Sequence, residues 1–398
     1  MNYNIPNLVF SDKRGNIYDH PTLKMCCRTN NFTIVPYESE LEELPKHTKL
    51  KYIENAKPLA YEPETAKIIE FDAGFTVYTS TPKGFLRTAL PAFRKPENFN
   101  YIKDSYAAIG FWEDKFYFSG IKIDLLTSDI TEHISMKNIL QKFQEKNPLI
   151  KHFSTLSKNI FEKIENLTPF GNELILDTFF IKDNRSEDIV EMINILNENQ
   201  EDLIITFSNL AQDNIIIKIS DVIKRINKNN NLTLNIEPYI INIDTFKPIL
   251  NSDIDLVTVN ISSFNNKIAH DILGFQQEYE TYLDNAQKLI DIAGRYDFEI
   301  VLNLNILPGF TDILSNVESF VDFLSTYNLN FVKFSNMEDN FEMFYNTKHV
   351  LQEEILGIRN MLKYIKKNYK TVKFGAFTRS KKYICKDTGL PDLKRRRR

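Results

Sequence analysis

Cysteine, glycine and tryptophan are scarce in this 398-residue chain, which has 3, 12 and 1 of them, respectively. The cysteines are Cys26, Cys27 and Cys385, an odd number without a Cys-x-x-Cys spacing. Such a set builds neither a disulfide framework nor a cysteine-based zinc site, and it favours a reducing, cytoplasmic location. The few glycines form no Gly-x-Ser-x-Gly, Gly-x-Gly-x-x-Gly or Walker A motif.

Histidine-based metal motifs and long apolar runs are also missing. The six histidines form no His-Glu-x-x-His and no pair at zinc-finger spacing, so we expect no metal site of these kinds. No apolar run approaches the roughly 20 residues of a membrane-spanning helix, and the first residues lack the apolar core of a secretory signal. We therefore expect a cytoplasmic protein without a membrane partner.

Positive and negative charges nearly balance over the whole chain, but positive charge is in excess near its end. Lys plus Arg number 49 and Asp plus Glu 53, which gives a net charge of −4. From Phe377 to Arg398, nine basic residues stand against two acidic ones, and the chain ends in Lys394-Arg395-Arg396-Arg397-Arg398. A solvated end is one interpretation of this block. Nonspecific attraction to RNA or another polyanion is the other.

The pattern of apolar residues predicts four successive regions. They are a β-rich N-terminal domain over residues 1–126, a helical connector over 127–170, strands alternating with helices over 171–376, and a basic tail over 377–398. In the first region, two alternating segments flank Glu113-Asp114, which predicts a hairpin. The third region has six strand–helix units and a short return strand at Val372–Phe374. This alternation is typical of a parallel α/β sheet, either open or curled into a partial barrel.

The segment Phe298–Ile306 shows the clearest strand alternation. Its aliphatic residues from Ile300 to Ile306 share one face, and Asn303 and Asn305 lie on the other. Such a strand fits the wall of a barrel that is covered outside by helices. After a Pro-Gly turn, Thr311 or Asp312 can cap the helix that follows.

Polar residues gather at the carboxyl end of each predicted strand, on the face opposite the aliphatic residues. Ligands of parallel α/β folds bind at that end of the sheet. The candidate ligand-pocket residues are Ser208, Asn235, Glu237, Asn260, Asn303, Asn305 and Lys333, with Thr206, Thr258 and the carboxylate of Asp177 beside them. A polar layer whose members bond one another is the alternative. Glu237 and Lys333 are candidates for a general base and its electrostatic partner, or for a buried salt bridge.

Several short motifs follow one another in an order that is found in known proteins. They are Ile5–Phe10, Gly15–Pro21, Gly84–Ala92, Asn147–His152, Val259–Ser263, Leu302–Asp312 and the pair Ser335-Asn336. In this order the chain resembles a family of bacterial radical S-adenosylmethionine proteins, from about Ile5 to Phe377. The resemblance implies a β-rich N-terminal domain followed by a partial (β/α)6 barrel of the TIM type, which is the fold class we expect.

The family's cofactor residues are not matched in this chain. The family binds a [4Fe–4S] cluster through three cysteines of a CxxxCxxC loop after the first barrel strand, and the cluster reduces S-adenosylmethionine. The corresponding region here, residues 152–186, contains no cysteine. The turn Ser208–Asn214 lacks the family's glycine, and Ser335 stands in place of an arginine. The resemblance therefore implies a degenerate homologue without the cluster, in which binding of S-adenosylmethionine alone remains open.

Three functions are compatible with these observations. The first is a non-catalytic homologue that binds a small polar ligand, or that binds and regulates a protein partner such as an active member of the family. The second is an enzyme that uses acid–base chemistry at the strand ends, with Glu237 and Lys333 as first candidates. The third is an RNA-associated protein that uses the tail Lys394–Arg398.

Overall fold

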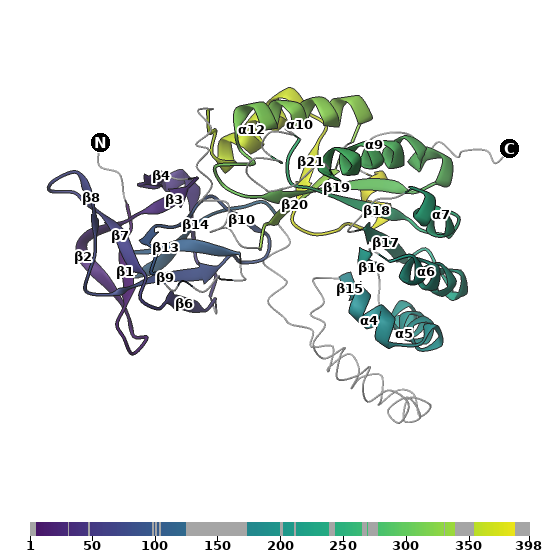
Figure 1. The fold of residues 1–398 in the computed structure, drawn as a ribbon, viewed down its shortest axis with the longest axis horizontal. Coiled ribbons are helices and arrows are strands. Elements are labelled where there is room, and N and C mark those ends of the chain that lie inside the picture. Colours follow the sequence, from purple (N-terminus) through teal and green to yellow (C-terminus); the bar gives the residue numbers. More distant parts are fainter. Residues whose placement is uncertain are drawn as a thin grey trace.

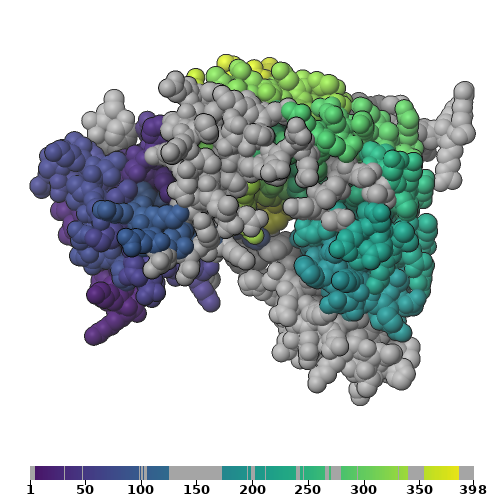
Figure 2. Space-filling view, viewed as in Figure 1, coloured from purple at the N-terminus to yellow at the C-terminus, as the bar shows by residue number. Residues whose placement is uncertain are grey.

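The structure is a computed structural model that describes three stretches of the chain. They are residues 5–124, 173–338 and 354–386, without 31, 47, 98, 100, 101, 103, 104, 200, 201, 211, 239–242, 265–268, 270–277 and 330. The predicted connector 127–170 and the tail Lys394–Arg398 lie outside these residues. An antiparallel N-terminal half is followed by a parallel seven-stranded half (Figure 1). The space-filling view shows the two halves at opposite ends of the molecule (Figure 2).

The N-terminal half is built almost entirely from antiparallel strands. An 11-stranded sheet contains β1 (Asn7–Ser11), β2 (Ile17–Met25), β5 (Leu41–Glu43), β6 (Leu50–Ile53), β7 (Lys57–Glu62), β8 (Lys67–Glu70), β9 (Phe75–Ser80), β10 (Phe85–Arg87), β12 (Phe93–Arg94), β13 (Tyr106–Trp112) and β14 (Lys115–Lys122). A three-stranded sheet contains β3 (Cys27–Thr29), β4 (Phe32–Ile34) and β11 (Leu90–Pro91), and η1 (Glu38–Glu40) precedes β5. The prediction of a β-rich first region is confirmed.

The predicted hairpin is confirmed in its turn as well as its strands. Trp112 of β13 pairs with Lys115 of β14. Glu113 and Asp114 have φ angles of 48° and 60°, and two successive left-handed residues are what a type I′ turn requires. Alternation along β1 also builds the core of this half, because Leu8 and Val9 point to opposite faces and join separate apolar clusters.

The C-terminal half is a parallel sheet whose strands follow the order of the chain. The strands are β15 (Glu173–Asp177), β16 (Leu203–Leu210), β17 (Leu232–Pro238), β18 (Leu256–Ile261), β19 (Glu299–Ile306), β20 (Phe331–Asn336) and β21 (Lys373–Gly375). The described helices are α4 (Thr178–Asp183), α5 (Ser186–Asn199), α6 (Asp213–Arg225), α7 (Ile243–Leu250), α9 (Glu278–Tyr296), α10 (Leu314–Tyr327), α12 (Ile358–Asn368) and α13 (Lys381–Lys386). The predicted alternation of strands and helices is confirmed.

The last predicted strand is present, and it extends a sheet that stays open among the described residues. The segment Val372–Phe374, predicted as a return strand, contributes to β21, which pairs in parallel with β20 and is a seventh strand of the same sheet. The intervening helix α12 provides the crossover that a parallel pair requires. Within the residues that the structure describes, no strand joins β21 to β15, so the sheet is not a closed barrel.

The two faces of the parallel sheet differ as the alternation in the sequence predicts. Ile300, Leu302, Leu304 and Ile306 of β19 belong to the large apolar cluster that includes residues of the flanking helices, such as Ile216, Phe246 and Phe320. Asn303 and Asn305 lie on the opposite face. Burial of each large aliphatic or aromatic side chain contributes about 1.5–3 kcal/mol, which fixes the register of the strands. The polar face is thereby positioned by packing on its reverse side.

The first strand of this sheet is shorter than the predicted Leu174–Phe180. It ends at Asp177, whose carboxylate accepts a hydrogen bond from the backbone N–H of Phe180 at 2.8 Å. Asp177 is therefore the N-cap of α4, and the segment from Thr178 onward is helical. The aspartate that we considered as a pocket carboxylate instead stops the strand and starts the helix.

The loop after β19 joins the two halves of the molecule. Neither Thr311 nor Asp312 caps α10, contrary to expectation, because its N-cap is Ile313. Both side chains bond back into the loop instead: the Thr311 hydroxyl contacts the backbone of Leu307, and Asp312 accepts from the N–H of Gly309 at 2.6 Å. The backbone oxygen of Gly309 accepts from the Asn30 side chain at 3.3 Å, which ties this loop to the N-terminal half.

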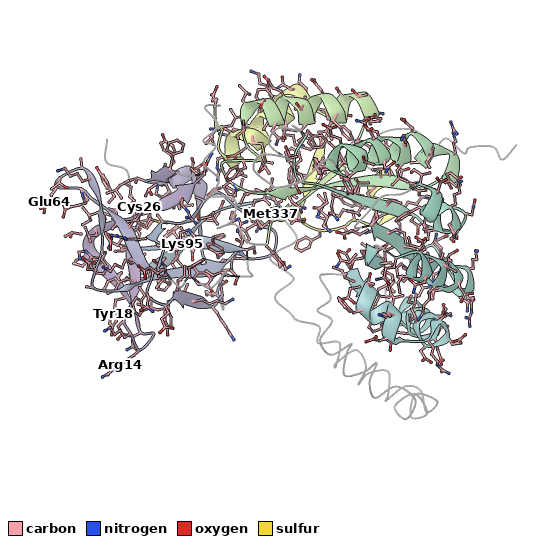
Figure 3. All side chains as sticks on the ribbon, in the orientation of Figure 1. Arg14, Tyr18, Cys26, Glu64, Lys95 and Met337 are labelled. Carbon is pink, nitrogen blue, oxygen red and sulfur yellow. The ribbon has the colours of Figure 1, made fainter. Side chains whose placement is uncertain are left out.

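A buried arginine makes a second link between the halves. The side chain of Arg87 on β10 is fully buried, and it donates to the backbone oxygen of Met337 at 2.6 Å. The backbone N–H of Arg87 donates to the side chain of Asn336 at 2.9 Å, and Asn336 donates to the backbone of Phe85 at 2.9 Å. Figure 3 shows Met337 between the two halves, whereas Cys26 lies within the N-terminal one.

The segment from residue 376 to residue 386, most of which we assigned to the basic tail, packs against the sheet. Ile384 of α13 forms an apolar cluster with Leu256, Val301 and Phe331, which belong to the face that also carries the polar residues. Arg379 donates to both carboxylate oxygens of Asp124 at 2.7 Å. The end of the N-terminal half and the end of the described chain are therefore held together.

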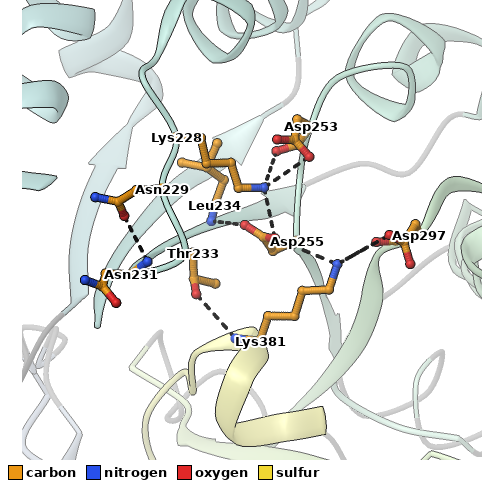
Figure 4. Close-up of polar contacts among 9 residues, drawn as sticks. All are labelled: Lys228, Asn229, Asn231, Thr233, Leu234, Asp253, Asp255, Asp297 and Lys381. Carbon is orange, nitrogen blue, oxygen red and sulfur yellow. Dashed lines mark hydrogen bonds and ion pairs between the residues drawn. The ribbon is translucent and has the colours of Figure 1, made fainter. Parts of the chain in front are cut away.

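Lys381 fixes the same segment at the amino ends of the strands (Figure 4). Its ammonium donates to the backbone oxygen of Asp297 at 2.9 Å and lies 3.9 Å from a carboxylate oxygen of Asp255. Asp255 also accepts from the N–H of Leu234 at 2.8 Å and pairs with Lys228 at 2.9 Å.

Among the described residues, we find no helix with the length and the apolar composition that a membrane span requires.

Candidate functional site

A row of hydrogen-bonded side chains crosses four strands near their carboxyl ends. The Ser335 hydroxyl donates to Asn303 at 2.8 Å, the Asn303 amide donates to Asn260 at 2.6 Å, and the Asn260 amide donates to Glu237 at 2.8 Å. Asn303 is buried, and the other three are half-buried. We call Glu237, Asn260, Asn303 and Ser335 the upper row.

The direction of donation along the upper row has an electrostatic consequence. Every bond points from β20 toward the carboxylate of Glu237 on β17, which acts as the final acceptor. Hydrogen bonds in a chain polarise one another, and a bond to an ionised carboxylate is about twice as strong as a neutral one. Among the described residues, Asn260 is the one side chain that donates to Glu237. The carboxylate therefore keeps acceptor capacity for another molecule.

Asn305 stands apart from the upper row although it lies on the same face. It is half-buried, and its side chain forms no hydrogen bond with the residues that the structure describes. Its register partner in β20 is Ser335, the first donor of the row. An amide offers two donors and an acceptor, so Asn305 adds unsatisfied hydrogen-bonding capacity beside the row.

A second, fully buried network lies on the same face, closer to the amino ends of the strands. Its members, the lower network, are Glu173, Thr206, Asn235, Thr258, Lys333 and Thr378, each at most 9% exposed. Thr258 donates to Asn235 at 3.0 Å, Asn235 to Thr206 at 3.1 Å, and Thr206 to Glu173 at 2.5 Å. Thr378 also donates to Glu173 at 2.8 Å and accepts from Lys333 at 3.3 Å. Of the candidate pocket residues, Asn235 and Lys333 belong here.

The structure keeps Glu237 and Lys333 apart. Glu237 bonds Asn260, while the Lys333 ammonium bonds the hydroxyl of Thr378 in the lower network. Both residues are described by the structure, and they form no ion pair with each other. The interpretation of a buried salt bridge between them is therefore wrong. A base and its electrostatic partner must lie within hydrogen-bond reach of one reacting group. The pair therefore does not form a ready-made acid–base couple.

Residues of the neighbouring helices hold the end of β18 in place. Asn316 of α10 accepts from the Ser263 hydroxyl at 2.9 Å and from the Phe264 N–H at 2.7 Å. Tyr279 of α9 donates to the backbone oxygen of Ser263 at 2.6 Å, and burial raises the pKa of Tyr279 to about 12. Tyr282 donates to the backbone oxygen of Asn260 at 2.8 Å. These contacts fix the position of the end of β18.

The cysteines do not fit an iron–sulfur cluster. Cys26 and Cys27 are buried among strands of the N-terminal half, and burial raises the pKa of Cys26 to about 12 and holds the pKa of Cys27 well above its usual value. Cluster ligation requires thiolates. After β15 the chain enters α4 directly through the cap of Asp177, with no cysteine in either element. The residues present therefore cannot supply three thiolates at that position.

Two residues of the lower network were missed from the sequence. Glu173 shares the parity of Asp177, but the predicted strand began one residue later, at Leu174. Thr378 has no sequence signal of its own, because its role depends on how the segment after β21 crosses the sheet.

The candidate pocket residue Ser208 is buried on the same face, and its backbone oxygen accepts from the Thr178 hydroxyl at 3.4 Å.

Comparisons with known proteins add no name to this geometry. A scan against protein-family models gives no match, and a search of curated proteins gives no match either. The site geometry and the residues of this chain therefore carry the functional argument.

Proposed function

We propose that this protein is a cluster-free relative of the radical S-adenosylmethionine proteins that binds a small polar ligand without catalysing radical chemistry. The ligand contacts the upper row and Asn305, at the carboxyl ends of β17–β20. The observation that carries the proposal is the half-buried carboxylate of Glu237, which ends a polarised chain of three hydrogen bonds. Parallel α/β sheets bind their ligands at this end.

Binding is favoured over acid–base catalysis by where the charged groups lie. Lys333 is buried and bonded to Thr378, so it does not reach the carboxylate that would act as base. The remaining groups of the upper row are amides and a hydroxyl, which orient a ligand but exchange no proton near neutral pH. A fixed set of donors and acceptors on a rigid sheet is typical of a recognition site.

The acceptor capacity of Glu237 indicates the kind of ligand. A carboxylate accepts hydrogen bonds and donates none when it is ionised, so its partner carries hydroxyl or ammonium groups. Asn305 and the other amides supply the complementary donors. S-adenosylmethionine has a ribose diol and an ammonium group, which makes it a suitable first probe. No cysteine ligand is needed for such an interaction.

Substitution of Glu237 by glutamine tests the proposal. We expect the full chain to bind S-adenosylmethionine in a calorimetric titration, and Glu237→Gln to weaken that binding roughly 10- to 100-fold, because a hydrogen bond to a charged group contributes about 1.5–3 kcal/mol. Glu299→Gln is the matched control, because Glu299 is exposed at the opposite end of β19. Adenosine, which lacks the ammonium group, separates contacts to the ribose from contacts to the amino acid part.

Two results would contradict the proposed site. One is the same affinity for S-adenosylmethionine in the wild type and in Glu237→Gln. The other is a wild-type protein that binds neither S-adenosylmethionine nor adenosine. The melting temperature of each variant shows whether a loss of binding reflects a loss of folding.

A further inference from the structure

A long stretch near the end of the described chain contains basic residues and no acidic ones. Between residues 355 and 386 there are ten lysines and arginines and not one aspartate or glutamate, although the whole chain has a net charge of −4. Three of these charges are paired with carboxylates: Arg359 with Glu42, Arg379 with Asp124, and Lys381 with Asp255 and Asp297. The others concentrate on α12 and on the segment that leads into β21.

Five lysines form one cluster on this part of the surface: Lys363, Lys366, Lys367, Lys370 and Lys373. The first three stand on one side of α12 at spacings of three and four residues, which brings side chains together. Four of the five are exposed, and Lys373 is half-buried. Lys363, Lys367 and Lys370 form no ion pair with any residue that the structure describes. We call these five residues the lysine cluster.

Two lysines of the cluster lie close enough to repel each other. Partial burial, together with the charge of Lys373, lowers the pKa of Lys366. Like charges four residues apart on a helix cost about 0.2–0.5 kcal/mol. The helix dipole favours cations in the last turn, which explains Lys366 and Lys367. It does not explain Lys363, which precedes that turn, or Lys370 and Lys373, which follow the helix.

We propose that the lysine cluster of α12 and β21 binds the phosphate backbone of a nucleic acid without reading its bases. A repeating polyanion contacts several lysines at once and releases its condensed counterions on binding. The cluster contains lysines, which bind phosphate as flexible point charges, rather than arginines with their planar bidentate fork. The helix α12 packs on the helix side of the sheet, on the opposite face from the upper row.

A membrane surface fits the cluster less well than a nucleic acid does. Helices that lie on membranes insert an apolar face into the lipid. The apolar residues of α12, Ile358, Met361 and Ile365, are instead buried against the sheet. None of the exposed large apolar side chains of the described chain falls between residues 355 and 376. Among the described residues of this surface, charge is therefore the main attraction to a membrane.

A triple substitution with a matched control tests this proposal. Fluorescence anisotropy of a labelled oligouridylate is measured with the wild-type chain, with Lys363→Gln/Lys367→Gln/Lys370→Gln, and with Lys182→Gln/Lys224→Gln/Lys288→Gln. The control lysines are exposed on α4, α6 and α9, so both triple variants lose the same charge. Each lost phosphate contact changes the slope of log K against log salt by about 0.7. We expect the cluster variant to lose about two units of slope and the control to lose little.

Each other outcome overturns the proposal. Equal loss in both triple variants would mean that net charge, not the cluster, attracts the RNA. Unchanged binding in the cluster variant, with loss after deletion of residues 394–398, would place the interaction in the tail. Binding to phosphatidylserine vesicles but not to oligouridylate would assign the cluster to membranes. Equal competition by polyglutamate would assign it to acidic proteins.

Discussion

The Asp312 carboxyl is expected to lower the stability of the protein by about 4 kcal/mol as the pH rises from about 4 to about 7, and Asp312→Asn is expected to remove this contribution. Burial raises the pKa of the Asp312 carboxyl from 3.8 to about 7. One pKa unit corresponds to about 1.4 kcal/mol. Asp312 is 1% exposed, so little of this effect is screened by water.

The surroundings of Asp312 explain the direction of the shift. Desolvation is the largest cause, and the negative charge of Glu40 adds to it, while the N–H of Gly309 opposes it by donating to Oδ1. The Oδ2 atom is buried without a hydrogen-bond partner. Burial raises the pKa of Glu40 as well, and the nearby Arg359 lowers it. Below about pH 7 the folded protein therefore keeps the carboxyl of Asp312 neutral.

The sign follows from proton binding in the two states. Between about pH 4 and pH 7 the folded protein keeps the Asp312 proton and the unfolded chain has released it. Stability therefore falls as the pH rises through this window. Denaturation of wild type, Asp312→Asn and the control Asp284→Asn, which alters an exposed carboxylate of α9, measures the effect. A wild-type curve as flat as that of Asp312→Asn would contradict it.

Gly309→Ala is expected to destabilise the protein by roughly 2–5 kcal/mol. Gly309 has a φ of +84°, and a Cβ there would lie 2.4 Å from the backbone nitrogen of Asn30 and 2.8 Å from the Thr29 hydroxyl. The left-handed backbone costs a non-glycine residue about 1–2 kcal/mol. Overpacking against backbone that cannot move away adds typically 1–3 kcal/mol.

Gly357 provides the matched control for this substitution. Its φ is +78°, but a Cβ there meets only the carboxylate of Glu40, at 2.9 Å, which is the end of a flexible side chain. Gly357→Ala therefore carries the cost of the backbone conformation without a clash against backbone that cannot move away. Thermal denaturation should give a clearly larger decrease in melting temperature for Gly309→Ala. Equal decreases would show that the contact with Asn30 contributes nothing.

Much of the parallel sheet could be predicted from alternation alone. The aliphatic residues of β19 lie at every second position, so they specify both the strand and its buried face. The face of the polar residues followed from the same parity, since Asn303 and its neighbours alternate with the aliphatic ones. The Glu113-Asp114 turn was equally local, because two residues between strands select the turn type.

The grouping of the polar residues could not be predicted in the same way. Parity places Glu237 and Lys333 on one face, but the neighbour of each depends on the stagger between strands and on the segment after β21. Thr378 reaches Lys333 and Glu173 only because residues 376–386 cross the sheet. Contacts between residues more than 40 positions apart leave no periodic trace in a single sequence. For the same reason, the contact between Asn30 and Gly309 could not be predicted from the sequence.

The boundary of β15 shows a competition between two local signals. The run Leu174–Phe180 is apolar apart from Asp177 and Thr178, and apolarity favoured one long strand. The aspartate and the following threonine are also an N-cap and a first helical residue. In the structure the strand ends at the N-cap, and the short strand followed by α4 buries Phe180 while leaving Phe179 exposed.

Iron and sulfide analysis after anaerobic reconstitution tests the central claim most directly. The central claim is that the scaffold has no thiolates for an iron–sulfur cluster. Reconstituted full chain, incubated with S-adenosylmethionine and dithionite, should contain no stoichiometric iron or sulfide and should form no 5′-deoxyadenosine. About one [4Fe–4S] cluster per chain, together with 5′-deoxyadenosine, would contradict it.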